Sequence, residues 1–155
     1  MKLAFRLNGV DALVEAPGDR RVVDLLREDL GLVGTKEPCG TGDCGGCTIL
    51  VDGESRLSCL MVAAQLEGRD VTTIEGLPGG ESNPLVRSFG EAGAVQCGYC
   101  TPGMVLSAVD LLRRSPSPSR DEIRTALSGN LCRCTGYAMI VDAVEAAAGR
   151  RGEEP

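Results

Sequence analysis

The chain contains no histidine and no tryptophan among its 155 residues, and only two tyrosines and two phenylalanines. Without histidine, it cannot by itself form a Ser-His-Asp or Cys-His catalytic centre, a histidine-ligated zinc site or a Rieske-type cluster. Basic surface is also scarce, because 16 Lys and Arg stand against 22 Asp and Glu, for a net charge of -6. Nucleic-acid binders rely on basic patches and aromatic rings, so this composition excludes nucleic acid as the main partner.

Long hydrophobic runs are absent as well. No stretch approaches the roughly 18 apolar residues that a membrane-spanning helix needs, so no membrane span is expected. Asn8-Gly9 and Asp11 interrupt the N-terminal segment before it reaches the length of a signal peptide. We therefore expect a cytoplasmic protein. In that reducing compartment, eight cysteines are more typical of metal ligands than of disulfides.

The first half of the chain has the pattern of a small, mostly β domain with one helix. Asn8-Gly9 and Asp52-Gly53 each separate two short apolar segments, and such pairs favour the tight turns of β-hairpins. Between the hairpins, apolar side chains recur near helical period up to Gly31. The expected elements are strands 3–7 and 10–15, a helix over 22–30, and strands 48–51 and 54–58.

The second half has helical spacing throughout. Turn-forming residues are concentrated in the segment 75–84. We expect residues 77–84 to link two domains. Pro102 suits the first turn of a helix, and Ser119 with Glu122 has the spacing of a capping box. The expected helices cover 85–91, 102–114, 120–127 and 137–148. The chain is thus divided into a domain at 1–76, a linker at 77–84, a helical domain at 85–150 and a frayed tail at 151–155.

The first cysteine set lies in a glycine-dense loop. Cys39, Cys44 and Cys47 have the spacing C-x4-C-x2-C, and Cys59 follows after a predicted hairpin. This is the spacing of plant-type 2Fe-2S ferredoxins, in which four thiolates surround an anionic cluster. Glycines in the loop can adopt positive φ angles and let backbone N–H groups approach the sulfurs, which stabilises negative charge without cationic side chains. A four-cysteine zinc site is the alternative, although such sites more usually pair two C-x2-C units.

The second set combines a C-x2-C pair, Cys97 and Cys100, with a C-x-C pair, Cys132 and Cys134. Its spacing by itself also fits a zinc site or a redox-active C-x-x-C pair. The first pair precedes an expected helix, whose N-terminus favours thiolate, and the second lies between two expected helices. Two loops of a helical bundle could therefore hold one cluster.

Three segments occur in a distinctive order. They are Gly-Thr-Lys-Glu-Pro-Cys-Gly at 34–40 with its continuation to Cys47, Gln-Cys-Gly-Tyr-Cys-Thr-Pro-Gly at 96–103, and Cys-Arg-Cys-Thr-Gly-Tyr at 132–137. In content and order they resemble the iron–sulfur subunit of the xanthine oxidase family of molybdenum hydroxylases, and the resemblance covers nearly the whole chain. It implies an α+β protein, with an N-terminal β-grasp ferredoxin-like domain followed by a four-helix domain, each holding one 2Fe-2S cluster.

The resemblance also implies roles for individual residues. Gln96 corresponds to the glutamine that hydrogen-bonds the molybdopterin of a large catalytic subunit, and Cys134 to the cluster ligand nearest that pterin. Tyr99 and Tyr137 are expected to be rings packed over the cluster rather than redox participants. The implied ligands are Cys39, Cys44, Cys47 and Cys59 for the ferredoxin-like cluster, and Cys97, Cys100, Cys132 and Cys134 for the helical-domain cluster.

The sequence departs from the family pattern at a few positions. Pro38 stands where the family often has glycine, which restricts the backbone before the first ligand and removes one N–H. Gly46 replaces a frequent alanine, and Ala138-Met139 replaces residues that are often polar. None of these positions is a ligand.

We therefore expect a non-catalytic electron-transfer subunit, since both four-cysteine sets are complete and no general base lies beside them. In the assembled enzyme, electrons would pass from the molybdopterin of a large subunit through the two clusters to a FAD subunit or another acceptor, in a dimer of heterotrimers. The alternatives are a free-standing two-cluster ferredoxin or redox sensor, and a zinc-bound structural adaptor. The sequence leaves the substrate open.

Overall fold

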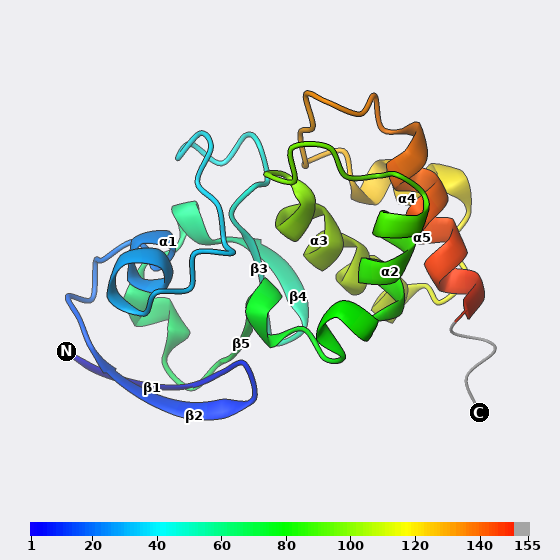
Figure 1. Ribbon diagram of the computed structural model, residues 1–155. Coiled ribbons are helices and arrows are strands. Elements are labelled where there is room, and N and C mark those ends of the chain that lie inside the picture. Colours follow the sequence, from blue (N-terminus) through cyan, green and yellow to red (C-terminus); the bar gives the residue numbers. More distant parts are fainter. Residues whose placement is uncertain (151–155) are drawn as a thin grey trace.

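The computed structural model describes residues 1–150, so the tail expected at 151–155 lies outside the described residues. The chain forms a mixed β-sheet followed by a group of helices, which confirms the expected α+β class (Figure 1). Within residues 1–150, no helix is long and apolar enough to cross a membrane. The strands are β1 (Lys2–Leu7), β2 (Val10–Glu15), β3 (Thr48–Val51), β4 (Glu54–Leu57) and β5 (Asp70–Thr72). The helices are α1 (Val22–Asp24), α2 (Pro84–Glu91), α3 (Thr101–Arg114), α4 (Arg120–Ala126) and α5 (Ala138–Arg150).

The sheet has the strand order β2-β1-β5-β3-β4. Both expected hairpins are present, and their turns have positive φ angles at Asn8-Gly9 and Asp52-Gly53, as tight hairpin turns require. The short strand β5 was not expected from the sequence. It pairs parallel with β1 and antiparallel with β3, and so joins the two hairpins into the single sheet of a β-grasp domain.

The helix expected over 22–30 is present but differs in its winding. After α1 the chain continues as a π-helical turn, Leu25–Asp29, which the Leu30 N–H closes by donating to the Leu25 carbonyl at 3.0 Å. Leu25 and Leu26 of this turn are buried against the sheet. Apolar spacing located the segment correctly, but it does not distinguish an α-helical turn from the wider π-helical one.

Strand β3 is buried along its whole length because both of its faces are covered. Ile49 and Val51 belong to the core between the sheet and the α1 segment, whereas Leu50 belongs to the core of the helical half. Figure 1 shows α3 lying beside β3 and β4 on that side. The two halves therefore share apolar packing and do not hang from a linker alone.

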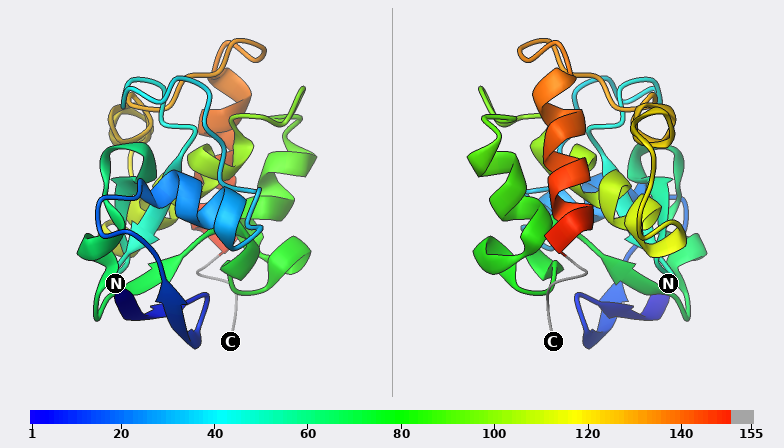
Figure 2. Two further views of the ribbon diagram at one scale, coloured as in Figure 1. Left: turned by 90° about the vertical axis from the view of Figure 1, so that its left-hand side faces the viewer. Right: turned by 90° about the vertical axis from the view of Figure 1, so that its right-hand side faces the viewer.

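The helical half contains the four expected helices. Figure 2 shows α2 and α5 side by side, with α3 between them and the sheet. The predicted capping box of α4 is confirmed, since the Ser119 N–H donates to the Glu122 carboxylate at 2.7 Å and the Glu122 N–H donates to the Ser119 hydroxyl. The segment before α2 also packs on this half, because Leu77 is buried in its core and the Asn83 side chain accepts from the Leu85 N–H at 3.0 Å.

Candidate metal centre

Three loops rich in cysteine and glycine lie at one end of the molecule, opposite the β1–β2 hairpin (Figures 1 and 2). The first connects the α1 segment to β3, the second connects α2 to α3, and the third connects α4 to α5. All eight cysteines are free thiols. Seven of them lie on these loops, and Cys59 lies on the short 3-10 turn Ser58–Leu60 that follows β4.

The structure brings the first cysteine set together as two pairs of thiols. Cys39 interacts with Cys44, and Cys59 interacts with Cys47. Cys47 and Cys59 are buried, whereas Cys39 is exposed on the outer side of the loop. Burial, followed by the neighbouring Cys47 thiol, raises the pKa of Cys59 to about 12. Hydrogen bonds from Thr41 lower the pKa of Cys39 to about 6.

Backbone N–H groups of the loop point at these sulfurs, as the glycine content predicted. The Thr41 N–H donates to the Cys39 Sγ at 3.4 Å, and the Gly42 and Gly46 N–H groups hydrogen-bond to Cys59 and Cys44. Gly42 has a φ of 86°, and a Cβ there would lie 2.5 Å from the Leu60 side chain. The positive φ favours glycine at position 42, where a side chain would also displace Leu60 on the turn that carries Cys59. Such N–H groups stabilise thiolate charge in an acidic protein.

The second cysteine set is also arranged as two pairs. Cys100 interacts with Cys132, and Cys97 interacts with Cys134, so each pair joins the loop before α3 to the loop before α5. Burial, followed by the Cys132 thiol, raises the pKa of Cys100 to about 12. Cys97 and Cys134 are the exposed pair. The second set thus has a half-buried side, with Cys100 and Cys132, and an exposed side that is open to a neighbouring molecule.

Side chains beside the second set hold its loop in shape. The Thr135 hydroxyl donates to the Cys132 Sγ at 3.1 Å, and the Cys132 N–H donates to the Tyr137 hydroxyl at 2.8 Å. Tyr137 has a φ of 74°, which is rare for a residue with a side chain. The Tyr99 ring lies 5.9 Å from the Lys36 ammonium, which belongs to the other half of the chain. Both tyrosines therefore have structural partners close to the cysteines.

The paired arrangement fits a two-iron cluster. Among the residues that the structure describes, no group of three or more potential ligands converges tightly enough for a single metal ion. A 2Fe-2S cluster instead takes two thiolates on each of its two irons, so its ligands are spread as two pairs. Thiols with a raised pKa need an adjacent positive charge to lose their protons, and iron supplies it. Both sets could hold such a cluster.

Gln96 lies on the exposed side of the second set. It directly precedes Cys97, its side chain is exposed, and its amide makes no hydrogen bond to any residue in the described part of the chain. A free amide at this position is available to a partner molecule. Val95, Tyr99 and Leu131 are exposed hydrophobic side chains close to the cysteines of the same set.

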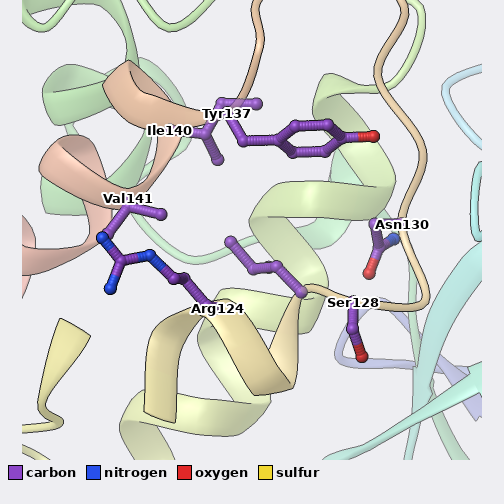
Figure 3. A pocket seen from close by; sticks show the side chains of 7 residues that line it. Arg124, Ser128, Asn130, Tyr137, Ile140 and Val141 are labelled. Carbon is purple, nitrogen blue, oxygen red and sulfur yellow. The ribbon is translucent and has the colours of Figure 1, made fainter. Parts of the chain in front are cut away.

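A hollow of about 230 Å³ lies between α4 and α5, beside the third loop. It is lined mainly by apolar side chains, and the ring of Tyr137 extends along one side of it toward Asn130 (Figure 3). Arg124 is its charged residue, and no cysteine lines it. Its volume is below the range of about 300–1,000 Å³ that is usual for small-molecule sites.

Comparison with known protein families divides the chain in two. A model described as a 2Fe-2S iron-sulfur cluster binding domain matches residues 5–73, and one described as a 2Fe-2S binding domain matches residues 73–145. These ranges contain the first and the second cysteine set, respectively. The chain therefore contains two 2Fe-2S-binding domains.

Whole-chain relatives agree with these matches. The nicotinate dehydrogenase small FeS subunit of Eubacterium barkeri is 48% identical over 94% of both chains. The nicotine 6-hydroxylase small subunit of Paenarthrobacter nicotinovorans is 45% identical over 99% of this chain and 93% of its own.

Solved structures give the same result. A chain of quinoline 2-oxidoreductase from Pseudomonas putida 86 superposes with a TM-score of 0.93 at 47% identity, covering 99% of this chain and 98% of that one. Aldehyde oxidoreductase from Desulfovibrio gigas superposes with a TM-score of 0.95 at 36% identity, covering all of this chain but 18% of that longer chain.

Proposed function

Because the chain belongs to the family of iron–sulfur subunits of molybdenum hydroxylases, we propose that it relays electrons between partner subunits through two 2Fe-2S clusters. The observation that carries this proposal is the presence of two complete sets of four thiols at the same end of one chain, each arranged as two pairs. The relatives are subunits of oxidoreductases, and this chain is the corresponding non-catalytic subunit.

We propose the following ligands. Cys39 and Cys44 hold one iron of the ferredoxin-like cluster, and Cys47 and Cys59 hold the other. In the helical domain, Cys97 with Cys134 and Cys100 with Cys132 hold the two irons. The thiol pairs seen in the structure support this division. The corresponding domains are residues 1–76 and 85–150, joined by 77–84.

When bound, each cluster accepts and releases one electron, so the two together can take the two electrons of one hydroxylation. The chain's own residues provide the thiolates and a shell of backbone N–H groups around the sulfurs. They also exclude water from the inner side of the first set, where Cys47 and Cys59 are buried. Burial and N–H groups are the features that set cluster potentials.

The finer proposals concern the partners. A large subunit would hold the molybdopterin next to Cys134, with its pterin hydrogen-bonded by Gln96, and a FAD subunit would receive electrons from the ferredoxin-like cluster. The exposure of Gln96 and Cys134 supports a contact on this side. We propose a dimer of heterotrimers, assembled in the cytoplasm, where eight free thiols remain available for iron.

The substrate is proposed to depend on the partner and not on this chain. The named relatives include subunits of nicotinate, nicotine, isoquinoline and aldehyde enzymes, although all of them are similar to this chain along most of its length. Because similar subunits occur in enzymes that act on such different substrates, we propose that this subunit transfers electrons and does not select the substrate.

Purification of the tagged chain from its source cells tests the proposal. The proposal predicts that a larger subunit containing molybdenum co-purifies, and that the substrate of that complex bleaches the cluster absorbance. A chain that purifies alone as a monomer with two loaded clusters would instead be a free-standing ferredoxin.

A further inference from the structure

Asn130 is a buried polar residue at the junction of the two cysteine sets. It lies on the loop between α4 and α5, two residues before Cys132, and is 5% exposed. Its side-chain oxygen accepts from the Ser107 hydroxyl of α3 at 2.8 Å. Its side-chain nitrogen donates to the Gly45 carbonyl at 3.1 Å and is 3.5 Å from the Thr48 hydroxyl. One amide thus joins the helical domain to the first cysteine loop.

The backbones meet closely around this amide. Gly45 has a φ of 71°, and a Cβ there would lie 2.3 Å from the Gly129 carbonyl and 2.6 Å from the Asn130 side-chain nitrogen. A Cβ on Gly103, in the first turn of α3, would lie 2.4 Å from the Gly45 carbonyl. Glycine at both positions allows the cysteine-bearing segments to touch without intervening side chains.

The residues that hydrogen-bond to the Asn130 side chain lie one to seven positions along the sequence from a proposed cysteine ligand. Gly45 directly follows Cys44, and Gly103 is three residues after Cys100. The Leu131 N–H donates to the Cys44 carbonyl at 2.8 Å, and Leu131 directly precedes Cys132. The Asn130 amide is therefore placed to fix the position of one thiol set relative to the other, because it is buried and rigidly hydrogen-bonded on both sides.

We propose that Asn130 is the positioning residue that sets the separation and orientation of the two thiol sets, and with them the coupling between the clusters they hold. The proposal rests on the proposed electron-transfer function. Two further polar contacts between the halves lie farther along α3, where Asp110 accepts from the Ser55 hydroxyl and Arg113 donates to the Gly53 carbonyl. These contacts join the domains but do not touch a cysteine loop.

The test uses the whole chain with both clusters loaded. Asn130→Asp keeps the shape of the side chain but replaces the donor to Gly45 with an oxygen that repels the carbonyl. Asp110→Asn is the matched control. It replaces a carboxylate with an amide, which is the reverse of Asn130→Asp, and it alters a buried contact between the domains that lies away from the cysteine loops. The readouts are iron content and the magnetic interaction between the two reduced clusters, seen as splitting or broadening in low-temperature EPR.

The proposal predicts that Asn130→Asp retains both clusters, with altered dipolar broadening and slower transfer between the clusters, whereas Asp110→Asn leaves the broadening unchanged. If Asn130→Asp fails to load both clusters, the EPR broadening of Ser107→Ala is compared with that of Asp110→Asn instead. Ser107→Ala removes only the hydroxyl that donates to the Asn130 side chain. Unchanged broadening in the loaded variant, or an equal change in Asp110→Asn, would overturn the positioning role. Failure of the wild-type chain to contain two clusters would instead overturn the proposed function.

Discussion

The ring of Pro38 occupies the space that a side chain on Gly46 would need. A Cβ on Gly46 would lie 2.5 Å from the Pro38 Cγ and 2.6 Å from its Cδ, which is closer than packed carbon atoms approach. From the family that the sequence resembles, we expect glycine to be frequent at position 38 and alanine at position 46. The residues at the two positions are coupled in this chain, because the proline ring is accommodated only when residue 46 has no side chain.

This coupling makes Gly46→Ala destabilising in this chain. Forcing one methyl group against the proline ring should cost about 1–3 kcal/mol, or roughly 5 °C in the thermal midpoint of the loaded protein. Adding Pro38→Gly should restore most of the loss, and the two changes should be clearly non-additive in a double-mutant cycle. Additive effects of the two substitutions would show that the ring and residue 46 do not compete for space.

Asp110 of α3 links the two domains by accepting hydrogen bonds from the Ser55 N–H and hydroxyl. Burial opposes its ionisation, but hydrogen bonds from Ser55 and Arg114 outweigh burial and hold the pKa of Asp110 below its usual range. Asp110→Asn should therefore lower the free energy of unfolding by about 1.5–3 kcal/mol at neutral pH. A carboxylate whose pKa is lowered by folding stabilises the fold fully at every pH above its pKa in the unfolded chain, which is near 4. It loses this contribution only as the pH falls below that value. The difference in thermal midpoint between the variant and wild type should thus stay constant from pH 7 to pH 5. A difference that shrinks over this range would mean that Asp110 titrates higher.

Cys134→Ser tests the assignment of ligands to domains. The change should remove the helical-domain cluster, slow turnover of the assembled enzyme and leave the EPR signal of the ferredoxin-like cluster, because the two sets share no ligand. Iron content should fall to about half of the wild-type value. Cys47→Ser is the matched control and should give the reverse pattern. If either substitution removed both clusters equally, the two-domain division of ligands would be wrong.

Gln96→Ala tests the proposed pterin contact. The Gln96 side chain is exposed and has no partner in the described chain, so both clusters and the stability should be unaffected. Loss of one hydrogen bond to the pterin should slow reduction of the clusters by substrate up to about tenfold. Stopped-flow reduction of the assembled enzyme measures this rate, with the neighbouring Val95→Ala as control. Equal reduction rates in wild type and Gln96→Ala would exclude the contact.

The elements with strong local signals were predictable from the sequence. Asn8-Gly9 and Asp52-Gly53 located both hairpins, and Ser119 with Glu122 located the start of α4, because turns and caps depend on residues close in sequence. Strand β5 was missed because it has only three residues, of which Val71 alone is buried. Its pairing with β1 and β3 is a long-range property that short apolar patterns do not encode.

The grouping of the cysteines into two sets of neighbouring thiols was predictable from the sequence, because cysteine spacing reflects loop geometry. Their role as cluster ligands stays a prediction. The packing of the two sets against each other was not visible. A single asparagine at position 130 has no sequence signal that distinguishes it from a solvated loop residue, and its role emerges only from burial beside Gly45. The available hint in the sequence was the continuous run Thr-Ile-Leu-Val at 48–51, which does not alternate with polar residues and so indicates a strand with both faces covered.

Iron and acid-labile sulfide analysis of the anaerobically purified chain, combined with low-temperature EPR after reduction, tests the central claim most directly. Two 2Fe-2S clusters require four irons and four sulfides per chain and two distinguishable EPR signals, and this is the predicted result. Zinc without sulfide, or iron for only one cluster, would contradict the account, because a chain with fewer than two clusters could not relay electrons between its two domains.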